Sequence, residues 1–544
     1  MTLWKLFEEA AQEHPDKAAL IFYGRKLSYL EIEKAANRLC HSFDVLGLKK
    51  GDRVAFVAAN TPHVPIAFLA AWKMGLVVAA VNPLEKPEAV VANLKLADPK
   101  VILVLENFTQ HTRAIQADAE LSSVRRCRIS ISAADFLPWK LRLGYKLKNT
   151  FKKPANFPKD WKWLCGLSAP GVWSRPSNVP KADDLAVLQF TGGTSGTPKA
   201  AMLTHANLVA NTDQAIRHIN RNKEVVGKDS VFLGVLPFFH VYGLSVCLNM
   251  AFTLGSTVVL LPKFEAKEVL STVQKYQINI FPGIQRMFAA LVVSIQESGP
   301  IYQYLLSKEY FRHLKLCFSG AGKLNPQTRS AFERFAGCPI VEGYGLSEAS
   351  PIISVSTVEK NRPGSLGTLV PDTEMKIMDD GELWVRGPQV MKGYWRNEVE
   401  TGSALPGDGW LATGDIVRQD AEGVLWMIDR KKDMIKVNGE NIYPQEIEKS
   451  ILTCEIVSDV AVIGLPDEIS GERVVACVVL KSLDPATDQE REFLTKRIIQ
   501  HCRELGLKGP SLPAEVRFVD DIPKNIVGKV LKFELKKMFT KSSV

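Results

Sequence analysis

The hydrophobic positions of the first 180 residues alternate between two spacings. Apolar residues at 30–46 recur about every 3.6 positions, which is typical of an amphipathic helix, and 65–73 is a second helical segment. Short apolar runs at 54–58, 76–81 and 101–105 are typical of buried strands. Helices that alternate with buried strands predict parallel sheets that carry helices on their faces.

This alternation continues to about residue 367 and then changes. Before residue 367, we expect more buried strands at 231–236, 257–261, 278–281, 314–319 and 340–342. Beyond residue 367, short segments between turn residues predict a small β-rich region at 374–378, 382–386, 416–419 and 424–428. The mixed pattern then returns, with helices expected at 444–453 and 489–504 and strands at 457–464, 474–480 and 514–519.

The pattern of elements predicts an α/β chain with a domain boundary near 429–432. We expect a large N-terminal domain at 1–429, made of two packed parallel-type α/β sheet subdomains and the small β-rich region. A small α+β C-terminal domain is expected at 433–544. The length of 544 residues suits two to four domains.

Composition excludes several classes of protein. Hydrophobic residues make up 46% and charged residues 23%, which rules out a disordered chain, a collagen-like fibre and a disulfide-stapled mini-protein. The 9 cysteines include no C-x-x-C pair, and scattered thiols suit a reducing cytoplasm. The apolar stretch 64–81 contains Lys73 and Gly75, so we expect a buried helix and strand there and not a membrane span.

The net charge of +9 is concentrated in one segment. Residues 135–162 hold eight lysines and arginines against two aspartates, interleaved with aromatic and leucine residues. This segment either contacts an anionic membrane surface or is a solvated loop with its aromatic side chains packed on the core. No nucleic-acid-binding motif accompanies the charge, so no nucleic-acid partner is expected.

The strongest chemical signal is a glycine-rich loop. Three glycines and four hydroxyl residues fill positions 191–197, and Lys199 follows. Backbone N–H groups and hydroxyls of such a loop can surround phosphate oxygens. The loop is not a Walker P-loop, because Pro198 precedes the lysine and 200–203 has the composition of a strand. Taken alone, such a loop is more often a flexible hairpin than a phosphate-binding loop.

Further segments carry nucleotide-like chemistry. The segment 342–348 follows a strand and presents Tyr344, Ser347 and Glu348, which can stack a base, touch a phosphate and hold Mg²⁺. Asp415 stands at a strand start, where its carboxylate can accept from ribose hydroxyls. A charged connector covers 429–439, and 523–529 places Lys529 beyond a turn. Each segment alone is more often an ordinary turn or surface segment.

In this order and spacing, the segments together resemble the adenylate-forming, or AMP-binding, synthetase superfamily. Within this superfamily, the segments are most similar to those of bacterial long-chain fatty-acid–CoA ligases. The resemblance covers nearly the whole chain, from residues 27–30 to Lys529. Such enzymes join a carboxylic acid to ATP, release pyrophosphate and transfer the acyl group to a thiol. The resemblance therefore implies an ATP-dependent acid–thiol ligase that uses a fatty acid, ATP, Mg²⁺ and CoA as co-substrate.

The resemblance also implies roles for individual residues. Tyr344 and Gly345 would contact the nucleotide, Ser347 the α-phosphate, Asp415 the ribose, and Arg430 would lie near the nucleotide. Glu348, together with Thr191, would hold Mg²⁺. The loop expected to cover the β- and γ-phosphates comprises Thr191, Gly192, Gly193, Thr194, Ser195, Gly196 and Lys199, and the expected wall opposite Tyr344 comprises Gly320, Ala321 and Gly322.

Catalysis is expected to depend on Lys529, whose ammonium would bridge the carboxylate and the α-phosphate. In the family a small C-terminal domain rotates between the half-reactions, and Lys432 occupies the hinge position within 430–432. After rotation, residues from Lys436 to Gly439 would face the thioester-forming site. His240 would lie between the carboxylate and the pantetheine path; a core histidine bonded to backbone is the alternative.

Some positions depart from the family pattern, and some assignments stay open. Ala200 replaces a glycine, Ser347 replaces the commoner threonine, and Lys323 stands where an uncharged residue is usual. The resemblance places the acyl tunnel along 280–288. Acyl carrier protein as acceptor, a catalytically idle acyl- or nucleotide-binding homologue, and a homodimer remain open. We expect a cytoplasmic protein, with peripheral binding to the inner membrane face as the open alternative.

Overall fold

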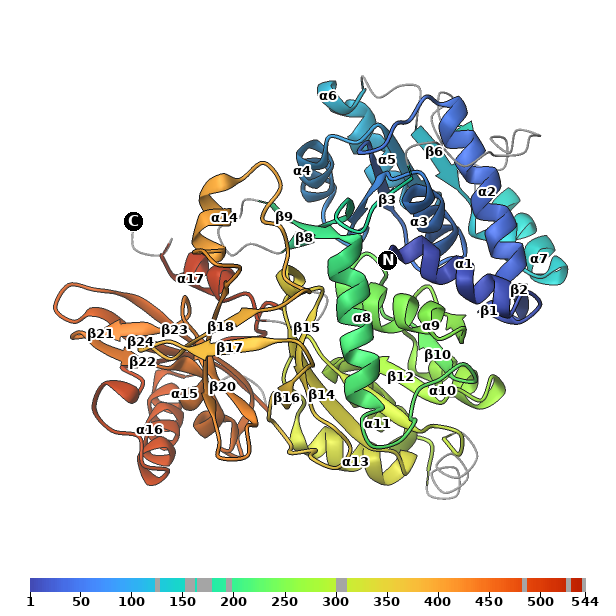
Figure 1. Ribbon diagram of the computed structural model, residues 1–544. Helices are drawn as coiled ribbons and strands as arrows, with labels where there is room; N and C mark the ends of the chain where they lie inside the picture. The colour runs from blue at the N-terminus through green and yellow to red at the C-terminus, as the bar shows by residue number, and fades with distance from the viewer. Residues whose placement is uncertain are drawn as a thin grey trace. The chain divides into compact units, whose positions relative to one another are not determined.

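The computed structural model describes residues 1–122, 128–151, 162–163, 179–191, 198–299, 311–481, 487–524 and 530–540. The chain divides into two compact units, shown in Figure 1. The first unit comprises Met1–Glu374 and Arg386–Leu411, and the second comprises Met375–Val385 and Ala412–Val544. This division does not test the predicted domains or the hinge at 430–432, which remain predictions.

One parallel sheet of the first unit carries the glycine-rich loop at its edge. Its described strands follow the order β7-β6-β5-β3-β4-β8-β9, and all neighbours are parallel except β8 and β9. The strands are β3 (Arg53–Val57), β4 (Val77–Val81), β5 (Val101–Leu105), β6 (Arg128–Ile131), β7 (Lys162–Trp163), β8 (Leu185–Thr191) and β9 (Lys199–Thr204). Because β8 and β9 are antiparallel neighbours, their loop begins at Thr191 and returns at Lys199.

A second sheet of the first unit has the order β16-β15-β14-β13-β12-β10-β11-β1-β2 over the described strands. The strands from β14 to β1 in this order are parallel, with antiparallel neighbours at both edges. The strands are β1 (Ala18–Phe22), β2 (Arg25–Ser28), β10 (Val231–Gly234), β11 (Thr257–Leu260), β12 (Ile280–Gly283), β13 (Leu316–Ser319), β14 (Ile340–Gly345), β15 (Ile352–Val355) and β16 (Thr368–Leu369).

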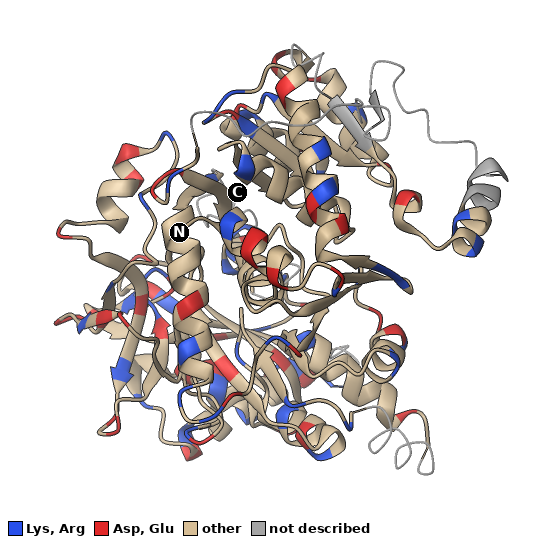
Figure 2. Cartoon of the chain, turned by 45° about the vertical axis from the view of Figure 1, so that its right-hand side comes forward, with Lys and Arg blue, Asp and Glu red and all other residues tan. Residues whose placement is uncertain are grey.

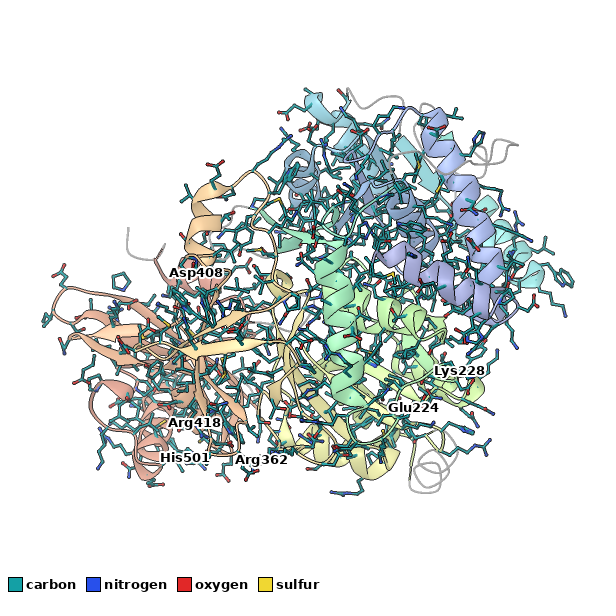
Figure 3. All side chains as sticks on the ribbon, viewed as in Figure 1. Glu224, Lys228, Arg362, Asp408, Arg418 and His501 are labelled. Carbon is teal, nitrogen blue, oxygen red and sulfur yellow. The ribbon has the colours of Figure 1, made fainter. Side chains whose placement is uncertain are left out.

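Helices cover these sheets with their apolar faces. Side chains of α4 pack with those of β3, β4 and β5 in a core that includes Val57, Ala79 and Leu94, and side chains fill the space between sheets and helices (Figure 3). The helices that the structure describes in this unit are α1 (Leu3–Glu13), α2 (Tyr29–Val45), α3 (His63–Lys73), α4 (Pro87–Ala97), α5 (Thr109–Ala117), α6 (Ala119–Ser122), η1 (Ala133–Phe136), α7 (Trp139–Phe151), α8 (His205–Ile219), η3 (Gly243–Asn249), α9 (Met250–Thr253), α10 (Ala266–Lys275), α11 (Gln285–Gln296), α13 (Pro326–Ala336), η4 (Ser347–Ala349) and α14 (Glu398–Ala404).

The second unit contains two sheets. One has the order β17-β18-β19-β20, and the other has the order β22-β21-β24-β23 with β25 beside β24. Buried residues of α15 and α16, including Ile447 and Ile498, form a core with the second sheet. The elements are β17 (Glu374–Ile377), β18 (Glu382–Arg386), β19 (Leu411–Gln419), β20 (Leu425–Arg430), β21 (Ile435–Val437), β22 (Glu440–Ile442), α15 (Pro444–Leu452), β23 (Val457–Asp467), β24 (Gly471–Leu480), α16 (Asp488–Glu504), η5 (Gly509–Ser511), β25 (Glu515–Phe518) and α17 (Lys532–Thr540).

The fold class predicted from the hydrophobic pattern is confirmed. The predicted strand 101–105 is β5 residue for residue, and the predicted helix 444–453 is α15 to within one residue. The apolar stretch 64–81 is the buried helix α3 followed by β4, as expected. No helix among the described residues combines the length and the apolar character that crossing a membrane requires.

Candidate active site

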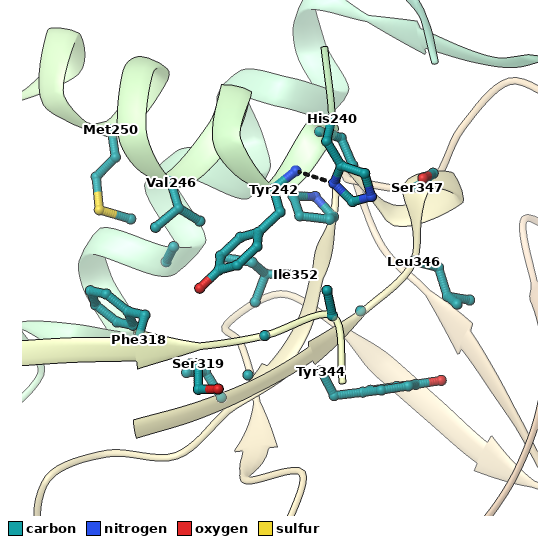
Figure 4. Close-up of a pocket in the computed structure, with 18 of the residues that line it drawn as sticks. His240, Tyr242, Val246, Met250, Phe318, Ser319, Tyr344, Leu346, Ser347 and Ile352 are labelled. Atoms are coloured by element: carbon teal, nitrogen blue, oxygen red, sulfur yellow. Dashed lines mark hydrogen bonds between the residues drawn. The ribbon is translucent and has the colours of Figure 1, made fainter. Parts of the chain in front are cut away.

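A pocket lies in the first unit, at the carboxyl ends of β13 and β14. Ligands of open parallel sheets bind at such strand ends. In Figure 4, Met250 lies on one side of the pocket, and Ser347 and Tyr344 lie on the other. The lining residues include Ala215, Ile219, His240, Val241, Tyr242, Val246, Met250, Phe318, Ser319, Gly320, Ala321, Tyr344, Gly345, Leu346, Ser347, Ile352 and Val355.

The polar end of the pocket needs residues without a side chain. A Cβ atom on Gly320 would lie 3.1 Å from the ring of Tyr242, and one on Gly345 would lie 1.8 Å from the carbonyl oxygen of Pro351. Ala321 has a φ of 63°, a left-handed conformation that turns the chain sharply after β13. The predicted site residues Gly320, Ala321, Tyr344, Gly345 and Ser347 therefore lie together in one pocket. Gly322 lies beside them on the exposed turn and is not part of the lining.

A buried ion pair supports this end of the pocket. Arg329 Nη1 donates to Glu342 Oε1 at 3.1 Å, and both side chains are less than 10% exposed. The same carboxylate accepts the backbone N–H groups of Leu324 and Gly364. Glu342 thereby joins β14 to the turn that follows Gly320. Sequence reasoning used Glu342 only as the start of a motif and missed this structural role.

His240 reaches the pocket because its segment is tied to the other sheet. Asn60 Nδ2 donates to the carbonyl oxygens of Gly234 and Leu236, and Asn60 Oδ1 accepts the N–H of Phe238 at 2.9 Å. Gln189 Nε2, on β8, donates to the carbonyl oxygen of Phe239 at 3.1 Å. These side chains bond to buried backbone groups at the end of β10 and in the segment that follows it. They place the next residue, His240, in the pocket.

The imidazole of His240 is a neutral group in an apolar setting. The backbone N–H of Tyr242 donates to His240 Nδ1 at 3.3 Å, drawn as a dashed line in Figure 4. With Nδ1 as the acceptor, the ring proton is on Nε2. Burial lowers the pKa of His240 to about 4. His240 can therefore donate one hydrogen bond to a ligand at neutral pH without adding a positive charge.

A second cluster joins the lysine that ends the glycine-rich loop to the predicted metal ligand. The Tyr394 hydroxyl donates to Glu348 Oε1 at 2.6 Å, and Lys199 Nζ lies 5.6 Å from the centre of the Tyr394 ring. Lys199 Nζ also pairs with Glu400 Oε2 at 2.6 Å. Burial, reinforced by the carboxylates of Glu348 and Glu400, raises the pKa of Tyr394 above its ordinary value, so its hydroxyl remains a donor.

The donor set fits Mg²⁺ that is shared with a nucleotide. Mg²⁺ is usually held by one or two carboxylates together with substrate phosphates, and not by an all-protein cage. The described residues contain no group of three or more acidic, histidine or cysteine side chains that could hold a metal alone. Glu348 and Thr191 are partly exposed, as ligands of a shared ion must be.

Several predicted site residues fall in other parts of the chain. Gly192, Gly193, Thr194, Ser195, Gly196 and Lys529 lie outside the described residues. In the second unit, Arg430 Nε pairs with Asp415 Oδ1 at 3.3 Å across β19 and β20, and Asp415 is 1% exposed. Lys432 and Lys436 are exposed, and Gly439 forms the β21–β22 turn with a φ of 84°. Their roles in binding and rotation remain predictions.

The apolar lining of the pocket is the main feature that sequence reasoning missed. Residues 280–288 form β12 and the start of α11 and are not among the lining residues. The lining comes instead from α8, η3, α9 and β15. The hydrophobic pattern of α8 carried no signal for this, because a residue that faces a pocket is as apolar as one that faces the core. Of the departures, Ala200 is fully buried in the core of the first sheet, and Lys323 is exposed.

Comparisons with known proteins agree with this geometry. The AMP-binding enzyme family matches residues 7–395, and the AMP-binding enzyme C-terminal domain matches residues 446–529. Long-chain-fatty-acid–CoA ligase of Bacillus subtilis is 36% identical to this chain, covering 98% of it and 94% of that protein. 4-Coumarate–CoA ligase 1 of Petroselinum crispum is 29% identical, covering 96% and 91%. The crystal structure of ATP-bound MatB from Rhodopseudomonas palustris matches 100% of both chains, with 25% identity and a TM-score of 0.82.

The chain belongs to the AMP-binding enzyme family. The family predicted from the nucleotide-like segments is thereby confirmed. The match covers both the region that contains the pocket and most of the second unit.

The state of His240 gives a testable pH dependence. Because its pKa is lowered to about 4, the ring gains a proton only well below pH 6. We expect the imidazole NMR signal of His240, assigned by its loss in His240→Gln, to titrate with a midpoint near pH 4. A midpoint near the ordinary value of about 6.5 would contradict the neutral, apolar setting.

Proposed function

We propose that this enzyme is a long-chain fatty-acid–CoA ligase. It activates a fatty acid with ATP to an acyl-adenylate and pyrophosphate, and then transfers the acyl group to CoA with release of AMP. The observation that carries the proposal is the pocket, whose apolar lining extends from Ser347 and Tyr344 to Met250. The name of the Bacillus subtilis relative supports the choice of a fatty acid.

Some residues of the pocket would bind the nucleotide, and others would bind the acid. Tyr344 would stack on the adenine, and Ser347 would donate to the α-phosphate. The neutral His240 would orient the carboxylate through Nε2–H. The apolar walls exclude water from the reacting atoms, which strengthens these interactions and protects the acyl-adenylate from hydrolysis. Each methylene that enters the pocket adds about 0.8 kcal/mol of binding, so pocket length can select the acid.

Glu348 and Thr191 would hold Mg²⁺, and the Tyr394 hydroxyl would orient the Glu348 carboxylate. When bound, Mg²⁺ would neutralise charge on the phosphates as pyrophosphate leaves. In the second unit, Asp415 would accept from the ribose hydroxyls, and Arg430 would keep that carboxylate oriented through the ion pair between them.

The proposed function predicts pyrophosphate release that depends on both the acid and ATP. We expect release with saturated acids of long chain and little with short acids, because short chains leave the apolar pocket partly unfilled. The assay should be run with CoA, with acyl carrier protein and with neither, and the thioester product should be identified. Thioester formed only with acyl carrier protein would replace CoA as the acceptor, and no acid-dependent release at all would indicate an idle homologue.

The adenylation step is proposed to need Lys529, delivered by a C-terminal domain that rotates about Lys432. An ammonium between the carboxylate and the α-phosphate stabilises charge that develops in the transition state. After that step the domain would turn and bring Lys436–Gly439 to the thioester-forming site. The exposed Asn438-Gly439 turn, with both φ values positive, gives a rigid tip suited to such a role.

Substitution of this lysine separates the half-reactions. Lys529→Ala should slow acyl-adenylate formation by about 10²–10³, a typical loss for one such charged group. It should leave thioester formation from supplied acyl-adenylate unchanged. Lys537→Ala, which removes an exposed lysine of α17, is the control for the charge of the basic tail. An equal loss in both steps would contradict the two-state assignment.

We also propose that the start of α7 binds an anionic membrane surface. Trp139, Leu141 and Leu143 are 72%, 49% and 55% exposed, and Lys140 and Arg142 are exposed between them. Elsewhere, acidic and basic residues are interspersed along the chain (Figure 2). Exposed aromatic and leucine side chains beside cations suit the interface of an anionic bilayer. Residues 152–161 of the basic segment lie outside the described residues.

Vesicle sedimentation tests this surface. The enzyme should bind phosphatidylglycerol-containing vesicles more tightly than pure phosphatidylcholine vesicles. The triple variant Trp139→Ser, Leu141→Ser, Leu143→Ser should lose about tenfold or more in partitioning. The matched control Val45→Ser, Leu84→Ser, Val293→Ser removes three exposed apolar side chains from other elements. Equal binding by all three proteins would support the solvated-loop alternative.

A further inference from the structure

Lys199, the cation that ends the glycine-rich loop, already has a carboxylate partner within the first unit. Its Nζ lies 2.6 Å from Glu400 Oε2, and the side chains of Lys199 and Glu400 are 18% and 40% exposed. The carboxylate therefore occupies a position at which an oxygen of a phosphate could accept from the same ammonium. Carboxylate and phosphate oxygens are equivalent partners for a lysine, which acts as a point charge.

The fold holds Glu400 in this place through a chain of local contacts. Residues after Val390 run beside β9: Met202 N donates to Gly393 O at 2.9 Å, and Trp395 N donates to Ala200 O at 2.8 Å. The helix α14 then begins after Asn397, whose side chain accepts the backbone N–H of Glu400 at 3.1 Å. Tyr394 is fixed on the same segment by its N–H bond to Thr401 Oγ1 at 2.8 Å.

Two carboxylates thus lie near Tyr394, and they have different partners: one accepts from its hydroxyl, and the other pairs with Lys199. Glu348 is bonded to the Tyr394 hydroxyl, which leaves its other oxygen available to a cation. Glu400 neutralises Lys199 on the ring face of the same tyrosine. An incoming polyphosphate is attracted by Lys199 but repelled by Glu400, and it cannot pair fully with the ammonium while Glu400 does.

We propose that Glu400 is an internal competitor of the nucleotide: the phosphates of ATP bind Lys199 by replacing the Glu400 carboxylate. The inference rests on the proposed function, because it takes Lys199 as a phosphate-binding group. Glu400 lowers the affinity for ATP and shields the lysine when the site holds no phosphate. It is an affinity-determining residue that takes no part in the chemical step.

Neutralising this carboxylate should tighten nucleotide binding. We expect Glu400→Gln to lower the dissociation constant of Mg²⁺–α,β-methylene-ATP about 3- to 10-fold at low salt, measured by calorimetry on the full chain. The difference should shrink as ionic strength rises, because the pair is partly exposed. Glu398→Gln removes the same charge from an exposed position on the same helix and is the matched control. A merely structural role for Glu400 would weaken binding, and that result would overturn the proposal.

A double-mutant cycle shows whether the effect passes through Lys199. In the Lys199→Met background, Glu400→Gln should no longer tighten nucleotide binding, because the ammonium for which Glu400 and the phosphates compete is absent. Equal tightening in both backgrounds, or equal tightening by Glu398→Gln, would mean a general charge effect and would also overturn the proposal. Absence of nucleotide binding by the unaltered enzyme would refute the proposed function itself, so the two failures are distinguishable.

Discussion

The backbone between β10 and η3 leaves its sheet inside the protein, and several of its buried amide and carbonyl groups are bonded by side chains. Asn60 and Gln189, which belong to the part of the chain that forms the other sheet, make these bonds at 2.8–3.1 Å. An unsatisfied buried polar group would cost about 1–3 kcal/mol, so these bonds hold the segment before His240 against the other sheet. The position of His240 in the pocket depends on them.

A second constraint acts around Glu348, which follows the pocket residue Ser347. The chain returns beside β9 after Val390 and brings Tyr394 between the carboxylate of Glu348 and the ammonium of Lys199. Nearly two hundred residues separate Lys199 from Tyr394, so this neighbourhood is set by backbone pairing and not by local sequence. The Tyr394 hydroxyl donates to the Glu348 carboxylate, and the Lys199 ammonium lies 5.6 Å from the centre of the Tyr394 ring. Tyr394 therefore helps to hold the carboxylate of Glu348 and the ammonium of Lys199 in place.

The apolar half of the site follows a different physical rule. Residues of α8, η3, α9 and β15 converge at the strand ends and together form the apolar lining of the pocket. The π-helical turns of η3 widen the helix locally, a feature that is frequent at functional sites. The neutral state of His240 is a consequence of this enclosure, because an apolar setting disfavours the charged imidazole. The apolar side chains that form the pocket are thus also the reason why His240 is neutral.

The sequence by itself was enough for the α/β fold class, since burial on both faces of a parallel strand leaves a continuous apolar run such as 101–105. It was also enough for the family, because several segments that are each more often ordinary turns occur together in the family's order and spacing. Only the tertiary structure decided which apolar residues face the pocket, since a core position and a lining position such as Val246 have the same chemistry. It also decided the partners of Lys199 and Glu348, because long-range pairing and not spacing along the chain brings Glu400 and Tyr394 to them.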